Sequence, residues 1–318
     1  MEDRIRDVVI LFTSIFYEAM PFIILGSIIS GILEHVVPQQ FITRFVPRNR
    51  PLAIAMSCLL GVVFPMCECG IVPVMRRLLR KGLPLSCCVA YMMAGPVLNV
   101  VVMLSTYAAF NAFAYGWWVI GLRAGLTFVI AFVTAVIIDG QYRKYGNDLL
   151  TPSTRPDAPG DDHVHEAPKS LGGKLAAISE TALSDFVDIT VFLTLGAVLS
   201  AVTRLMFSQD RIEYFGQAYP ILSILGMMGL AIALCICSEA DAFIAASFSS
   251  LPPAPKIAFL VLGPMLDFKL YLLFTRVFKQ RVIWIIVTSV IVQTFLYSLA
   301  VHYLMPVFPP EASAAMPK

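Results

Sequence analysis

Long apolar stretches alternate with short polar connections along this chain. Each main stretch reaches the roughly 20 residues that a helix needs to cross about 30 Å of hydrocarbon. The main stretches cover residues 8–37, 83–110, 117–138, 183–206, 254–274 and 282–304. None alternates apolar and polar residues as the strands of a membrane barrel do. The pattern therefore predicts an all-α integral membrane protein.

Two further apolar stretches are interrupted by polar motifs. Residues 51–75 contain Cys67-Glu68-Cys69-Gly70-Ile71-Val72-Pro73, and residues 219–250 contain Cys235-Ile236-Cys237-Ser238-Glu239-Ala240-Asp241. A Gly-Pro motif follows each, first as Gly95-Pro96-Val97-Leu98-Asn99 and then as Gly263-Pro264-Met265-Leu266-Asp267. Carboxylates and other polar groups are costly inside a bilayer, so these motifs predict a paired intramembrane site.

The two sets of motifs indicate an internal repeat. Cys67 and Cys237 are 170 residues apart, and the same offset relates Leu25–Ser30 to Leu195–Ser200. The two Gly-Pro motifs are 168 residues apart. Repeats of this size are common in secondary transporters, which place their site where the repeats meet.

The interrupted stretches leave two topologies open. If each is one broken span, each repeat has four spans and the repeats are parallel. If each is a broken or re-entrant helical hairpin, each repeat has three spans plus the hairpin and the repeats are inverted. The inverted model places 15 Lys and Arg residues in the cytoplasm and 6 outside, against 13 and 8 for the parallel model. Because cytoplasmic loops carry excess Lys and Arg, we expect inverted repeats.

One long hydrophilic stretch divides the chain. Asp139 to Lys174 is rich in Pro, Gly, Asp and Ser, which is typical of a flexible linker. Both topologies place this stretch in the cytoplasm. We expect a first membrane repeat in residues 1–139, the linker in 140–178, a second membrane repeat in 179–306 and a polar tail in 307–318.

Composition narrows the function classes. Hydrophobic residues make up 58% of the chain and charged residues 14%, with a net charge of +2 and no basic stripe for nucleic acid. The 7 cysteines lie in or beside apolar segments, which argues against a secreted disulfide framework. No nucleotide-binding motif is present, and we expect no cofactor and no metal centre.

The motif residues are the predicted substrate site. Cys-x-Cys pairs offer thiolates to a soft cation or a trivalent metalloid, although a buried cysteine can also serve as a small hydrophobe. Pro96 and Pro264 each remove a helical hydrogen bond, which frees a carbonyl one turn earlier. The predicted substrate-binding residues are Cys67, Glu68, Cys69, Asn99, Cys235, Cys237, Glu239, Asp241 and Asp267.

Other charged residues in the apolar stretches suit coupling or structural roles. Glu18 and Asp188 occupy equivalent repeat positions near segment ends. Lys269 and Arg123 are possible counter-ions for the carboxylates, and a carboxyl of altered proton affinity would suit proton coupling. The basic run at residues 76–81 reads as an interfacial topology anchor.

The four motifs resemble the predicted permease family that includes YraQ and the organoarsenical exporter ArsP. The resemblance covers nearly the whole chain outside the linker and the tail. It implies a multi-pass permease of the bacterial inner (plasma) membrane and, for ArsP-like members, export of trivalent methylated or aromatic arsenicals. Glu68 departs from the small residue that the resemblance leads us to expect there, which would suit a substrate of different charge.

Three functions follow as hypotheses. The first is a secondary transporter, not an enzyme, that moves a small soft or anionic solute by alternating access in the lipid bilayer, with a homodimer as one possible assembly. The second is a membrane thiol oxidoreductase, although redox pairs more often have the spacing Cys-x-x-Cys. The third is a non-transporting scaffold, which leaves the repeated carboxylates unexplained.

Overall fold

Most of the described residues lie in helices. A computed structural model describes residues 2–38, 47, 49–64, 66–111, 116–151, 171–204, 220–248 and 251–304. The predicted tail and residues 152–170 of the predicted linker lie outside the described residues. The helices are α1 (Glu2–His35), α3 (Arg50–Val63), α4 (Glu68–Arg80), α5 (Leu85–Ala94), α6 (Val100–Asn111), α7 (Gly116–Tyr145), η1 (Gly146–Leu149), α8 (Leu171–Arg204), α10 (Pro220–Leu234), α11 (Asp241–Ser247), α12 (Pro253–Leu262), α13 (Phe268–Val277) and α14 (Gln280–Leu304).

The prediction of an all-α protein is confirmed for the residues that the structure describes. Among the described residues, 4 helices are long and apolar enough to cross a membrane. These candidate spans are Phe12–His35, Gly116–Tyr145, Gly172–Val198 and Gln280–Leu304. Helix α7 continues to Tyr145 and α8 begins at Leu171, so helix occupies both ends of the stretch expected to be linker.

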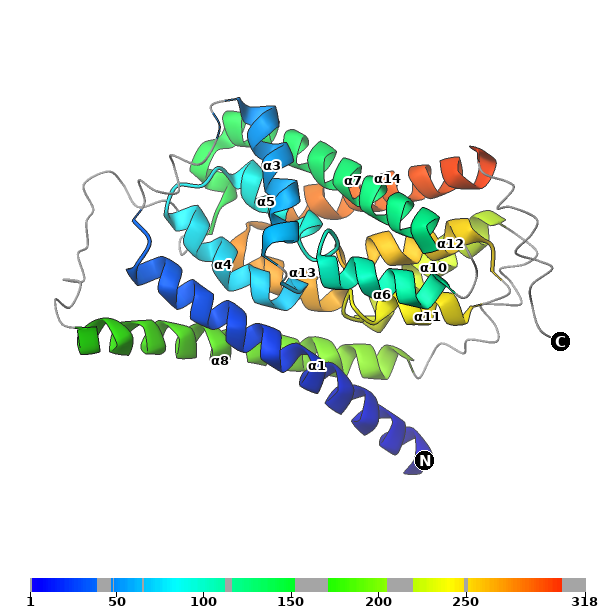
Figure 1. Cartoon of the computed structure of the whole chain (residues 1–318), viewed down its shortest axis with the longest axis horizontal. Helices are drawn as coiled ribbons and strands as arrows, with labels where there is room; N and C mark the ends of the chain where they lie inside the picture. Colours follow the sequence, from blue (N-terminus) through cyan, green and yellow to red (C-terminus); the bar gives the residue numbers. More distant parts are fainter. Residues whose placement is uncertain are drawn as a thin grey trace.

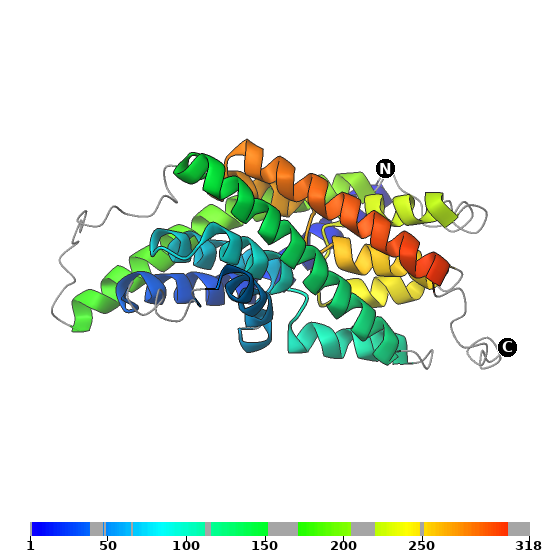
Figure 2. The same cartoon turned by 90° about the horizontal axis from the view of Figure 1, so that it is seen from above.

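Long helices frame a centre of short ones. Helices α1 and α8 pack against each other along one side of the molecule, and α7 packs against α14 along the opposite side (Figure 1). The short helices lie between these two pairs, with α3 and α4 toward one end of the long axis and α10 and α11 toward the other (Figures 1 and 2). Contacts between α4 and α13, and between α6 and α11, join the two halves of the sequence.

The Gly-Pro motifs end one helix and allow another to begin. Helix α5 stops at Ala94, and α6 starts at Val100 after a turn around Pro96, which has no N–H to continue the helix. The Asn99 side chain then accepts a hydrogen bond from the Val101 N–H at 2.8 Å. Residues 83–110 were expected to form one span in which Pro96 removes a single hydrogen bond, but the structure breaks the span there and Asn99 lies at the start of a new helix.

The second Gly-Pro motif repeats this geometry. Helix α12 ends at Leu262, and α13 begins at Phe268 with Asp267 as its N-cap. The Asp267 carboxylate accepts a hydrogen bond from the Leu270 N–H at 2.6 Å. Short polar side chains at this position satisfy N–H groups that have no helical partner, so both motifs build capped breaks where kinked helices were expected.

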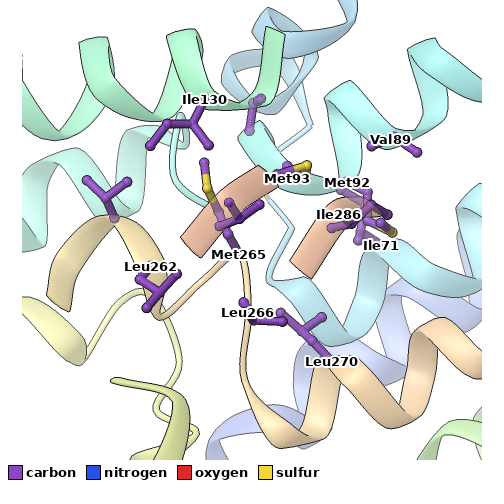
Figure 3. Packing of buried hydrophobic residues seen from close by; sticks show 14 of the residues in the cluster. Ile71, Val89, Met92, Met93, Ile130, Leu262, Met265, Leu266, Leu270 and Ile286 are labelled. Atoms are coloured by element: carbon purple, nitrogen blue, oxygen red, sulfur yellow. The ribbon is translucent and has the colours of Figure 1, made fainter. Parts of the chain in front are cut away.

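Apolar side chains from both halves fill the space around these breaks. Figure 3 shows Ile71 of α4, Met92 of α5 and Ile130 of α7 in the same cluster as Leu262 of α12 and Ile286 of α14. All are at most 2% exposed. The breaks therefore lie inside protein, where backbone groups without helical partners are tolerated at membrane depth.

Two glycine pairs let helices approach to backbone contact. A Cβ at Gly61 of α3 would overlap the Gly95 carbonyl oxygen, and a Cβ at Gly26 of α1 would overlap that of Gly70 on α4. Small residues at helix interfaces are the usual means of close packing in membranes. The positions of α3 and α4 against their neighbours therefore depend on the absence of a side chain.

We expect Gly61→Ala to destabilise the protein by about 1–3 kcal/mol, because the added methyl group meets backbone that cannot move aside alone. Thermal unfolding of the purified protein in detergent measures the effect. The matched control is Gly121→Ala on α7, where an added Cβ meets nothing within 4 Å. Equal melting temperatures for the two variants would contradict this account of the α3–α5 contact.

Candidate functional site

A buried ammonium group lies at the centre of the first polar cluster. The Lys269 Nζ is 2.7 Å from Glu68 Oε1 and 3.6 Å from Asp267 Oδ2. It is also 4.0 Å from the Cys237 Sγ. The side chains of Lys269, Glu68 and Asp267 are at most 1% exposed. We call Lys269, Glu68, Asp267 and Cys237 the lysine cluster.

The lysine cluster forms where helix starts from the two halves of the chain meet. Glu68 is in the first turn of α4, Asp267 caps α13 and Lys269 is in the first turn of α13. Helix N-termini carry partial positive charge and stabilise carboxylates. Gly196 of α8 lies against Lys269, with room for hydrogen only, since a Cβ there would come within 2.9 Å of the Lys269 Cβ.

Thiols lie beside the ammonium group. Cys67 and Cys69 flank Glu68, which pairs with Lys269, and the Cys237 Sγ is 4.0 Å from the Lys269 Nζ. Cys235 lies beside the backbone of Phe268 and Lys269. These four thiols are at most 2% exposed. Both Cys-x-Cys pairs thus come together at one buried centre.

The backbone at Cys235 is strained. Its φ of 47° lies in the left-handed region, and it is the one non-glycine residue with such a φ in the part of the chain that the structure describes. Residues held in sparsely populated backbone conformations cluster at functional sites. The segment from Cys235 to Ala240 separates α10 from α11, so this strain accompanies the second helix break.

A buried guanidinium group organises the second polar cluster. The Arg123 Nη2 of α7 is 2.6 Å from Asp241 Oδ2 and donates to the Ser238 carbonyl oxygen at 3.3 Å. The Arg123 Nη1 donates to Thr106 Oγ1 of α6 at 2.7 Å. We call these residues the arginine cluster. Because Ser238 directly follows Cys237, the two clusters adjoin along the chain.

Several buried polar atoms of the two clusters and of the Asn99 cap have no hydrogen-bond partner within the described structure. They are Glu68 Oε2, Asn99 Nδ2, Arg123 Nε, Ser238 Oγ, Asp241 Oδ1 and Asp267 Oδ2. Leaving a buried polar atom unsatisfied costs roughly 1–3 kcal/mol. Such atoms in native proteins are expected to meet water, ions or ligands, so their concentration here indicates a polar binding centre.

The predicted substrate residues divide between the clusters. Cys67, Glu68, Cys69, Cys235, Cys237 and Asp267 lie at or beside the lysine cluster, and Asp241 belongs to the arginine cluster. Glu239 is partly exposed, and Asn99 acts as a cap. Among the described residues, no group of three or more His, Cys, Asp or Glu side chains is arranged to hold a metal ion.

Sequence reasoning did not anticipate parts of the arginine cluster. Arg123 had appeared only as a possible counter-ion, although an arginine inside an apolar span already signals a buried partner. Thr106 and Ser238 were not singled out, because a hydroxyl or a carbonyl within apolar sequence carries no comparable signal. Pro96 and Pro264 lie in the helix breaks and contribute through the backbone.

The basic run contacts acidic side chains of α1 and α8. Arg77 is 3.3 Å from Asp185 and 3.4 Å from Glu34, while Arg76 is 3.5 Å from Asp188. We call these five residues the α4 network. Asp188 is 46% exposed in this pairing and lies apart from the lysine cluster. Glu18 is in α1, but its side chain lies outside the described residues.

Comparisons with known proteins relate the chain to membrane permeases. The family model ArsP_1, described as a predicted permease, matches residues 4–303. The UPF0718 protein YcgR of Bacillus subtilis (strain 168) is 40% identical over 292 residues, which are 92% of this chain and 95% of that protein. No solved structure matches the chain.

Two further relatives extend this picture. A Streptococcus mutans serotype c protein, named provisionally as a two-component membrane permease complex subunit, is 30% identical over 275 residues, 86% of this chain and 87% of its own. The UPF0718 protein YraQ of Escherichia coli (strain K12) is 23% identical over 272 residues, 82% of this chain and 71% of its own.

We expect Lys269→Met to destabilise the protein by about 3–5 kcal/mol, because it leaves two buried carboxylates without their cation. The double variant Glu68→Gln with Lys269→Met removes one of these charges and should recover part of the loss. Unfolding of both variants in detergent, monitored by tryptophan fluorescence, measures the difference. A double variant less stable than the single one would contradict direct pairing of the two side chains.

Proposed function

The chain belongs to the ArsP_1 family of predicted permeases, and we propose on this basis that it is a secondary transporter of a small soft solute. Family membership favours a transporter over an enzyme. The single observation that carries the proposal is the buried contact of Lys269 with Cys237 and with Glu68, which Cys67 and Cys69 flank in the chain. Thiol ligands select soft ions and thiophilic metalloids, and a trivalent organoarsenical is the substrate class we propose first.

We propose a multi-pass protein of the bacterial plasma membrane built from two inverted repeats. The helix order supports this, because α1, α3 to α6 and α7 of the first half parallel α8, α10 to α13 and α14 of the second. The arrangement in Figure 1 also supports it, since α3 and α4 lie toward the end where α8 begins, and α10 and α11 lie toward the opposite end. Each of these pairs would then be a re-entrant hairpin.

Alternating access around the two clusters would move the solute. The α4 network ties the first hairpin to α1 and α8 at the end where α8 begins. The equivalent stretch of the second hairpin, Asp241–Ser247, carries no basic side chain. The network would therefore close one side of the membrane in this conformation and separate when that side opens.

A second protein component fits the proposal. The name of the Streptococcus mutans relative describes a subunit of a two-component membrane permease complex. We propose that this chain is the membrane-embedded component of such a system, with homodimerisation as a separate possibility for co-purification to resolve. The thiol oxidoreductase hypothesis retains one specific observation, the free and buried Cys67 and Cys69 thiols two residues apart, and predicts their oxidation during turnover.

We expect cells that lack their own arsenic exporters to accumulate less methylarsenite when they produce this chain, because efflux returns the compound to the medium. Cys67→Ala and Cys237→Ala should each return methylarsenite accumulation to the level of cells without the chain. The matched control is Cys58→Ala, which removes an equally buried thiol of α3 outside the site. Lower accumulation that survives both site substitutions would return the thiols to a packing role, and unchanged accumulation with the intact chain would contradict this substrate class.

We expect Arg77→Gln to increase the rate at which a maleimide added from the cytoplasmic side labels Cys69, by about tenfold for the loss of roughly 1.4 kcal/mol of closure. Everted membrane vesicles allow this measurement. Arg143→Gln is the control, because its ion pair with Asp139 lies on the surface of α7. Equal labelling rates in the two variants would contradict a closing role for the α4 network.

A further inference from the structure

The two clusters contain more buried acidic than basic side chains. Three carboxylates, those of Glu68, Asp241 and Asp267, are at most 2% exposed, and two cations, Lys269 and Arg123, are fully buried among them. An uncompensated charge at membrane depth costs several kcal/mol, so the excess carboxylate must acquire a proton or another cation. The geometry decides which carboxylate is in excess.

Glu68 and Asp241 each have a close partner. Glu68 accepts from Lys269 at 2.7 Å, and Asp241 accepts from Arg123 at 2.6 Å, distances typical of charge-assisted hydrogen bonds. Asp267 Oδ2 is 3.6 Å from the Lys269 Nζ and has no hydrogen-bond partner. Asp267 is therefore the carboxylate that the two cations leave in excess.

The first Gly-Pro motif shows that the cap itself needs no charge. Asn99 holds the corresponding place there, and its Oδ1 accepts from Val101 as Asp267 Oδ1 accepts from Leu270. In both caps the second polar atom, Asn99 Nδ2 or Asp267 Oδ2, is buried without a partner. A neutral amide thus performs the structural task, so the acidic side chain at residue 267 must serve another purpose.

We propose that Asp267 is the binding site of the coupling proton, which rests on the proposed transport function. The proton adds to the Asp267 Oδ2 and converts the carboxylate to a neutral carboxyl, and its release to the other side of the membrane restores the negative charge. The groups that face Asp267 are Lys269 on its own helix, Glu68 on α4 and the Cys235 thiol.

Infrared spectroscopy of the purified chain in lipid vesicles tests proton binding without any transported solute. We expect the carbonyl band of a buried protonated carboxyl at neutral pH, shifted by isotopic labelling of aspartate at its side-chain carbon. Asp267→Asn should remove the band and preserve the fold, because asparagine caps helices as well as aspartate. Asp185→Asn, which removes another buried carboxylate away from the site, should retain it.

A band that survives Asp267→Asn, that fails to shift with labelled aspartate, or that is absent from the intact chain would overturn the proposal. A band that disappears when sodium is added at constant pH would overturn it in favour of a metal cation. In vesicles, Asp267→Asn should make methylarsenite flux insensitive to a protonophore that slows the intact chain at least tenfold. If neither the intact chain nor Asp267→Asn transports methylarsenite, the proposed substrate class is contradicted, and the infrared test of proton binding is unaffected.

Discussion

The ion pair between Lys269 and Glu68 constrains the rest of the structure. A charge cannot remain alone in the interior of a membrane protein, so the two helices that carry these residues must meet. Helix α4 comes from the first half of the chain and α13 from the second. Their N-terminal ends must therefore point toward one another at the centre, and the pair fixes the register in which the halves assemble.

The helix breaks follow from the same constraint. An unbroken span would present only side chains at the centre, whereas α4 and α13 both begin there. Glu68 lies in the first turn of α4, and Asp267 accepts a hydrogen bond from the Leu270 N–H of α13. At α13, the Gly263-Pro264 turn and the Asp267 cap make this start possible. The cost is backbone without helical hydrogen bonds, and the surrounding apolar cluster keeps that backbone away from lipid.

The sequence was sufficient for the features that depend on local pattern. Apolar length predicts the long helices, and the polar motifs mark the positions of the breaks. The sequence alone did not determine which distant residues form pairs. The partner of Asp241 is Arg123, separated by 118 positions, and the basic residues of α4 engage acids of α1 and α8. Composition records the presence of both charges, but only the fold determines which of them meet.

The capping roles of Asn99 and Asp267 were missed for a related reason, because a proline in an apolar run is compatible with both a kink and a full break.

The burial of every cysteine has a practical consequence. All 7 thiols are free and inaccessible in this conformation, and Cys67, Cys69, Cys235 and Cys237 line the centre itself. The unmodified protein therefore carries its own reporters of opening, since a thiol reagent can reach these residues only when the helices around them separate. Mass-spectrometric mapping of which cysteine reacts, and from which face of the membrane, would give a record of the conformational cycle without a single engineered label.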